Sequence, residues 1–224
     1  MKARNLELRV TLIVIPMMLF MAVLVFVPAW TLNYWQGWLF LATLFIPMFF
    51  VFLYMLKHYR KLLEKRINVK EKREKQGALQ IFNTVLFFML MVIAGLDRRF
   101  GWSQLPPYVS IVCAVVMFTG YMAFIKTMLH NEYASRVIEI QKGQKLIDTG
   151  PYAVIRHPMY ASGMLMYIFI PLVLGSWWGE IPMLLIPVNL TIRLLDEERM
   201  LIKELKGYKR YMKKVKYRLI PWVW

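Results

Sequence analysis

The feature that most constrains this chain is a run of 47 residues without a charged side chain. Residues 10–56 hold no Asp, Glu, Lys or Arg, and residues 76–96 and 100–125 are equally free of charge. A helix rises 1.5 Å per residue, so about 20 apolar residues cross the hydrocarbon core of a bilayer once. The first run is long enough for two crossings, and each of the others for one. The chain is therefore predicted to be an all-α integral membrane protein with four clear transmembrane helices.

The first charge-free run must turn near its middle. Pro28, Asn33, Gln36 and Gly37 are the residues there that favour a turn. They lie among tryptophans and a tyrosine, which favour the interface between membrane and water. The sequence thus predicts a tight interfacial turn between the first two helices.

The distribution of Lys and Arg predicts the orientation. Of the 29 basic residues, 27 fall in four segments: the N-terminus, residues 57–75, residues 126–156 and the tail from Arg193. Cytoplasmic segments carry an excess of such residues. We therefore expect the N-terminus and the active site in the cytoplasm. The basic segment at residues 57–75 has no predicted role beyond attraction to anionic lipid. Because topology accounts for the net charge of +16, no nucleic-acid partner is expected. The lone Cys113 fits packing, and no metal site is predicted.

The chain changes character after the fourth helix. Residues 130–150 are polar and predict a cytoplasmic connector with some helix. Pro158 stands where a proline begins a helix, so residues 159–178 are predicted as one further helix. Gly175, Gly179 and Pro182 mark its turn. A last helix is predicted from Pro182 to about Leu205, with its second half outside the bilayer.

Beyond this hairpin the spacing predicts an amphipathic tail helix. Leu201, Leu205, Tyr208, Met212 and Val215 recur at intervals of three and four, with lysines between them. Such a helix lies along the membrane or folds back over the site. The whole chain, residues 1–224, is predicted as a single membrane domain, with residues 1–130 forming the four-helix part and residues 131–224 the catalytic part.

Two polar clusters flank the apolar hairpin. Arg156, His157 and Tyr160 surround the predicted helix start, where free N–H groups suit an anion. His157 as a mere helix cap, with Arg156 reaching lipid headgroups, is the alternative. Arg193 and Glu197 form an i,i+4 pair at the other end, which in water would be an ordinary helix pair. Near membrane depth a charged group is costly, so a bound ligand explains the pair better.

These motifs resemble a known family. The order of Gly150-Pro151-Tyr152, Arg156-His157-Pro158-Met159-Tyr160, Arg193 with Glu197 and Glu198, and Gly207 to Tyr211 resembles the isoprenylcysteine carboxyl methyltransferases and their phospholipid methyltransferase relatives. The resemblance implies S-adenosylmethionine as cofactor. It implies cofactor contacts at Leu146, Ile147, Tyr152, His157, Pro158, Tyr160 and Glu197. It also implies that Arg193 faces the methyl acceptor. Glu198 is predicted as a second catalytic residue, because an acceptor that must lose a proton needs a base.

The acceptor is left open by the residues. A carboxylate needs only a cation such as Arg193 to orient it, whereas an amine or thiol must lose a proton, for which Glu198 or His157 are candidates. The expected partners are the lipid bilayer and a lipophilic or small acceptor, and the oligomeric state is open. A phospholipid N-methyltransferase and a small-thiol S-methyltransferase are the alternatives within enzymes. A transporter or a membrane interaction protein is the alternative outside them.

Overall fold

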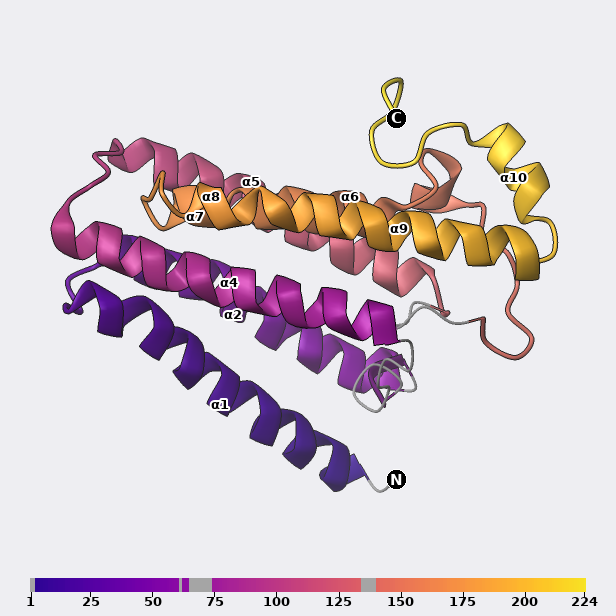
Figure 1. Cartoon of the computed structure of the whole chain (residues 1–224). Coiled ribbons are helices and arrows are strands. Elements are labelled where there is room, and N and C mark those ends of the chain that lie inside the picture. Colours follow the sequence, from indigo (N-terminus) through magenta and orange to yellow (C-terminus); the bar gives the residue numbers. More distant parts are fainter. Residues whose placement is uncertain (1–2, 61, 65–73, 134–139) are drawn as a thin grey trace.

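The computed structural model describes residues 3–60, 62–64, 74–133 and 140–224. Within these ranges the chain forms helices and no strand. Four long helices run side by side (Figure 1): α1 Ala3–Ala29, α2 Trp35–His58, α4 Glu74–Phe100 and α5 Pro107–His130. Each contains a stretch of 24 or 25 residues that is long and apolar enough to cross a membrane. The prediction of an all-α membrane protein with four transmembrane helices is confirmed.

The turn between the first two helices is shorter than predicted. α1 ends at Ala29 and α2 begins at Trp35, so Gln36 and Gly37 belong to α2 and not to the turn. Trp30 carries the reversal with a positive φ of 56°. It remains 75% exposed, with the Arg99 guanidinium 5.3 Å from its ring centroid. Trp30 is therefore an aromatic residue of the type found at the membrane interface, and it marks the end of the bundle opposite to the start of α1.

The C-terminal hairpin forms as predicted but is broken twice. Its first arm is α6, Pro158–Ile168, followed by the short α7, Ile170–Val173, and it ends well before residue 178. Its second arm is α8, Glu180–Met183, followed by α9, Leu185–Glu204. Both arms break a few residues before a proline, Pro171 or Pro187. Proline lacks the N–H that a helix needs and its ring clashes with the carbonyl four residues earlier.

The hairpin packs against α4 and α5 and not against α1, which lies on the far side of α4 (Figure 1). Leu90 and Met91 of α4, Met117 of α5 and Met183 of α8 are fully buried in the shared core. Cys113 is also buried there, as predicted from its apolar surroundings. Gly120 lets α5 and α6 approach closely, because a Cβ atom would lie 3.1 Å from the Met166 backbone nitrogen.

A buried carboxylate fixes the hairpin at the opposite end of the bundle. Asp97, at the end of α4, is 2% exposed. It accepts hydrogen bonds from the Ser103 backbone N–H and hydroxyl, both 2.6 Å, and from the Ser176 hydroxyl. These bonds tie the loop between α4 and α5 to the loop between α7 and α8. The hairpin is thereby held in register along the bundle, which positions the polar residues at its other end.

The tail departs from the predicted amphipathic helix. α9 ends at Glu204, and Gly207 adopts a φ of +90° that favours glycine. A separate short helix follows, α10, Tyr208–Lys214. Its apolar face survives, because Leu205, Tyr208, Tyr211 and Val215 are buried together. The chain then folds back toward the bundle, the second of the two predicted arrangements (Figure 1).

The predicted connector helix is not seen in the described residues. Residues 131–133 and 140–149 form turns and extended backbone, and the single turn of 3₁₀ helix η1 follows at Gly150–Ala153. Residues 134–139 lie outside the described part. Most of the basic loop at residues 57–75 also lies outside it.

Candidate functional site

A cavity of about 470 Å³ lies at the basic end of the bundle, where α1 and α4 begin and α5 ends. Its walls come from α4, α5, the connector, α6, α9 and α10. Of the nine predicted site residues, seven line it: Leu146, Ile147, Tyr152, His157, Tyr160, Arg193 and Glu197. Pro158 and Glu198 do not line it. The cavity thus joins residues from both predicted polar clusters, which are more than 30 positions apart in the sequence.

The start of α6 brings His157 and Tyr160 against α9. His157 is the residue before the helix, as predicted, but its side chain makes no capping hydrogen bond. The interpretation of His157 as a cap is therefore wrong. The Tyr160 hydroxyl donates to Glu197 Oε2 at 2.6 Å, and the His157 and Tyr160 rings meet edge to face at 5.8 Å. This bond holds one Glu197 oxygen and leaves the carboxylate facing the cavity.

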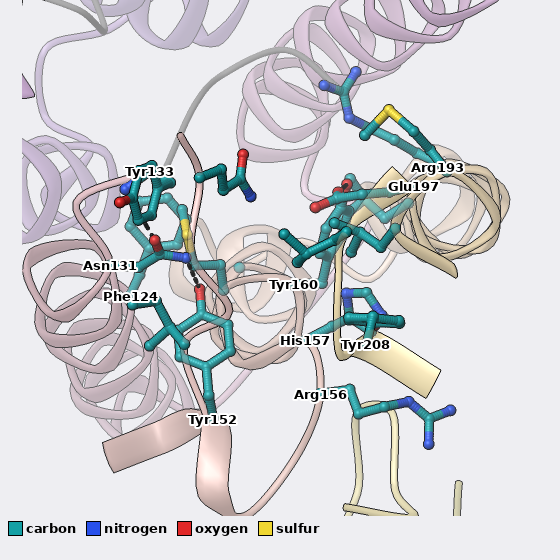
Figure 2. Close-up of a pocket in the computed structure, with 18 of the residues that line it drawn as sticks. Phe124, Asn131, Tyr133, Tyr152, Arg156, His157, Tyr160, Arg193, Glu197 and Tyr208 are labelled. Atoms are coloured by element: carbon teal, nitrogen blue, oxygen red, sulfur yellow. Dashed lines mark hydrogen bonds between the residues drawn. The ribbon is translucent and has the colours of Figure 1, made fainter. Parts of the chain in front are cut away.

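Arg193 lies one helical turn before Glu197 on α9. Figure 2 shows both side chains on the same side of the cavity, opposite Tyr152 and Asn131. α4 and α9 run antiparallel there, because Gln76 bonds to Asp196 at 2.6 Å and Asn83 to Asn189 at 3.0 Å. Seven residues separate the two bonds on each helix, so Arg193 lies between them, on the bilayer side of Glu197.

The opposite wall is built around Tyr152. Its hydroxyl accepts a bond from Asn131 Nδ2 at 3.0 Å, and the Tyr133 backbone N–H donates to Asn131 Oδ1 at 2.9 Å (Figure 2). The Tyr211 hydroxyl of α10 donates to the Tyr152 carbonyl at 2.7 Å. Burial raises the pKa of Tyr152 to about 12. The Tyr152 side chain is therefore a neutral phenol at pH 7, held by Asn131 of the connector, while α10 holds the Tyr152 backbone.

Glu198 lies behind the cavity wall in a buried ionic network. Arg156 Nε donates to Glu198 Oε1 at 2.7 Å and Arg218 Nε to Oε2 at 2.8 Å. His157 Nε2 is 3.5 Å from Oε1. Burial alone would raise the pKa of Glu198, but its bonds to His157 and Arg218 and the charge of Arg156 lower the pKa to about 2. Glu198 therefore stays ionised and is better suited to anchoring the tail than to accepting a proton.

Arg156 is among the residues that line the cavity, but its guanidinium belongs to the same network as Glu198. Its side chain is 5% exposed, and Figure 2 shows it directed away from the other labelled residues. Nη1 donates to the carbonyls of Val215 and Lys216 at 3.0 and 2.7 Å. The alternative that Arg156 reaches lipid headgroups is therefore wrong, since its donors are used within the protein.

Tyr208 is the most informative lining residue that the site prediction left out. It is 3% exposed, and among the described residues its hydroxyl has no hydrogen-bond partner. Figure 2 places it beside His157. A buried hydroxyl without a partner is unfavourable, so this atom indicates a place for a ligand. In the sequence, the Gly207 to Tyr211 motif points to this position. Tyr208 also fits the apolar spacing of the tail helix, which conceals its place in the site.

α4 supplies a polar wall that the sequence prediction also missed. Gln80, Asn83 and Thr84 line the cavity from one helical face. Asn83 is held by Asn189 of α9, and the Thr84 hydroxyl donates to the Gln80 carbonyl at 2.8 Å. The sequence feature that could have predicted this wall is an i, i+3, i+4 pattern of polar residues inside a charge-free span, where polar side chains are costly.

Comparisons with known proteins agree with this arrangement. Residues 108–207 match the family model described as phospholipid methyltransferase. The fold is similar to the solved structure of a eukaryotic intramembrane Ras methyltransferase, isoprenylcysteine carboxyl methyltransferase, with a TM-score of 0.51 and 17% sequence identity. This likeness covers 96% of the present chain and 86% of the other. No curated protein matches the sequence.

Proposed function

We propose that this chain is a membrane methyltransferase of the phospholipid methyltransferase family, whose model its residues 108–207 match, and that it transfers a methyl group from S-adenosylmethionine. The acceptor is a lipophilic or small molecule reached from the cytoplasmic face of the membrane. One observation carries the proposal. The cavity at the basic end gathers His157, Tyr160, Arg193 and Glu197 on neighbouring helices.

The cavity residues fit such a cofactor. A volume of about 470 Å³ falls within the usual range of about 300–1,000 Å³ for small-molecule sites. Glu197 offers a carboxylate to a cationic group, and the Tyr208 hydroxyl is an unused donor and acceptor. Leu146 and Ile147 supply apolar surface, and Tyr152 a fixed phenol. Pro158 acts by starting α6, since it does not line the cavity.

Bound S-adenosylmethionine would supply an electrophilic methyl group, so the protein's task is to position the acceptor in line with it. Arg193, on the bilayer side of Glu197, can orient a carboxylate through two N–H donors. Glu198 is held ionised with a pKa of about 2, bonded to two arginines. Its carboxylate is too weakly basic to deprotonate an amine or thiol at pH 7. Of the two candidate bases this leaves His157, which lines the cavity, for an amine or thiol acceptor, whereas a carboxylate acceptor needs no base.

The polar wall of α4 favours an acceptor with further hydrogen-bonding groups. Asn83 and the Thr84 hydroxyl each have one bond within the protein, to Asn189 and to the Gln80 carbonyl, and a wholly apolar acceptor would leave their remaining hydrogen-bonding capacity unused. A buried donor or acceptor left without a partner costs about 1–3 kcal/mol. We therefore infer an amphipathic acceptor whose polar head enters between α4 and α9, while any lipid chain stays in the bilayer.

The test uses purified protein in nanodiscs. Calorimetry with S-adenosylmethionine should show binding, and labelled methyl should pass to at least one member of a panel of lipid extract, prenylcysteine analogues, other amphipathic carboxylates and small thiols. Absence of cofactor binding would reject the proposal. Methyl transfer in washed membranes would exclude a transporter or a passive interaction protein.

Arg193→Ala separates the two halves of the site. We expect it to lower turnover by about 100-fold or more, because the acceptor loses its orienting cation, while cofactor affinity stays within about twofold. The matched control is Arg199→Ala, an exposed residue further along α9. Equal loss of turnover and cofactor affinity in Arg193→Ala would instead assign Arg193 to the cofactor.

A further inference from the structure

The last residues of the tail form an exposed apolar loop. We call residues 215–219 the strap and residues 220–224 the tip. In the tip, Trp222 is 85% exposed, Val223 75% and Ile220 55%. Trp222 also has a φ of +63°, a conformation that costs energy for any residue other than glycine. An exposed tryptophan held in a strained turn is a costly arrangement in water.

The tip lies at about the level where the apolar spans begin (Figure 1). Figure 1 shows that α10 extends beyond the ends of the spanning helices and that the chain then turns back. The C-terminus comes to rest at about the level along the bundle where α4 begins. The α4 span starts at Gln76, so the tip is level with the edge of the apolar belt. Tryptophan prefers this interfacial depth.

The charge around the tip matches an anionic surface. Lys213, Lys214 and Lys216 are exposed in the last turn of α10 and the start of the strap, and Lys209 and Arg210 are exposed at the start of α10. One acidic neighbour, Asp148, lies 3.3 Å from Lys214 Nζ. Basic residues beside an apolar tip are attracted to the anionic lipids of a cytoplasmic leaflet. An anionic bilayer surface would bind the apolar tip through its interfacial layer and the lysines through its lipid headgroups.

We infer that the tip docks into the interfacial layer of an anionic bilayer and thereby holds the strap against the segment that precedes α6 and carries His157. The strap is directly connected to the site. The Tyr217 and Arg218 carbonyls accept bonds from the Arg156 and His157 backbone N–H groups at 2.9 and 3.0 Å. Arg218 also bonds to Glu198. Docking therefore stabilises the wall that carries His157, Tyr208 and Tyr211.

The docking itself is tested by depth measurement and does not depend on the proposed function. In a Cys113→Ala background, a spin label is placed by Val223→Cys or, as control, by Lys209→Cys on α10. In nanodiscs of mixed phosphatidylcholine and phosphatidylglycerol, oxygen should reach the label at 223 more readily than a water-soluble nickel reagent does. The label at 209 should show the reverse. Equal access of the nickel reagent to both labels would overturn the docking. This is also the result expected if the tip binds a protein partner and not the membrane.

The coupling to the cavity rests on the proposed function and is tested by cofactor affinity. Trp222→Gly removes the aromatic ring without strain at its positive φ, and Trp30→Gly does the same at the opposite end of the bundle. In anionic nanodiscs we expect Trp222→Gly to weaken S-adenosylmethionine affinity about fivefold, at the low end of typical couplings between sites. Trp30→Gly should not change it, and neutral lipid should weaken the wild type to the same extent.

The outcomes distinguish the two ideas. Equal affinities of Trp222→Gly and wild type in anionic nanodiscs would overturn the coupling. Absence of any cofactor binding in the wild type would reject the proposed function, whereas the spin-label depths would still decide whether the tip docks.

Discussion

At the scale of single residues, Tyr208 tests the cavity most directly. Its buried hydroxyl has no partner among the described residues, so Tyr208→Phe should leave the free energy of unfolding unchanged or raise it. If the hydroxyl contacts the cofactor, affinity should fall about five- to tenfold, as expected for the loss of one hydrogen bond. Calorimetry and thermal unfolding measure the two effects. Unchanged affinity would remove Tyr208 from the site.

Glu198 predicts a pH dependence of stability. In the unfolded chain its pKa is about 4.3, and in the folded protein it is lowered to about 2. Its stabilising effect is therefore complete above about pH 4.3 and is lost as the pH falls from there toward 2. Thermal unfolding between pH 7 and pH 2 should show this loss in the wild type and not in Glu198→Gln.

Glu198→Gln should also be less stable at pH 7, by about 3–5 kcal/mol, because it leaves the buried Arg156 and the half-buried Arg218 without their counter-charge. Glu204→Gln, at an exposed position on the same helix, is the control and should change little. Similar pH profiles for wild type and Glu198→Gln would contradict the network.

Asn83 tests the nature of the acceptor. Replacement by Leu removes the polar group from α4 and leaves Asn189 without its partner. We expect turnover of acceptors with polar heads to fall about tenfold, with apolar acceptors less affected, since only the former lose a hydrogen bond. The measurement is the ratio of kcat/KM values across the acceptor panel. A uniform loss would indicate a structural role for Asn83.

At the scale of elements, the connection between the two loops at the opposite end should matter for stability. Asp97→Ala leaves the Ser103 and Ser176 donors without their acceptor, which should lower the free energy of unfolding by about 1–3 kcal/mol or more. Thermal unfolding in detergent measures it, with Glu64→Ala, from a partly exposed i,i+4 pair, as control. Equal unfolding temperatures for the two variants would contradict the role of Asp97.

Helix boundaries show where local signals suffice. The starts of α5 and α6 were predictable, because Pro107 and Pro158 fit the first helical turn. The breaks at Phe169 and Leu184 follow from Pro171 and Pro187, although both arms were predicted as continuous. α9 ends at Glu204, close to the predicted end at about Leu205. The break before α10 was missed because the apolar spacing continues through Gly207, and the positive φ of Gly207 is not visible in that spacing.

At the scale of the whole molecule, the predicted family resemblance is confirmed by the match of residues 108–207, and the membrane fold by the solved relative. Cytoplasmic orientation, the cofactor and the individual site residues stay predictions. Seven of nine predicted site residues share one cavity because the motifs lie at the same ends of the two hairpin arms. Glu198 follows Glu197 directly on α9, so its side chain points to a different face of the helix. It bonds to Arg218 of the strap and does not line the cavity.

The sequence by itself determined the membrane fold, the number of spans and the location of the motifs. Those properties depend on transfer free energies and helix spacing, which add up locally along the chain. Only the tertiary structure decided that Tyr208, Asn83 and Asn131 line the cavity and that Arg156 and Glu198 secure the strap. These contacts join segments that lie far apart in the sequence, 60 residues for Arg156 and Lys216 and 106 for Asn83 and Asn189. They depend on how α4 packs against α9 and on the turn at Gly207, and neither is encoded in any single stretch of residues.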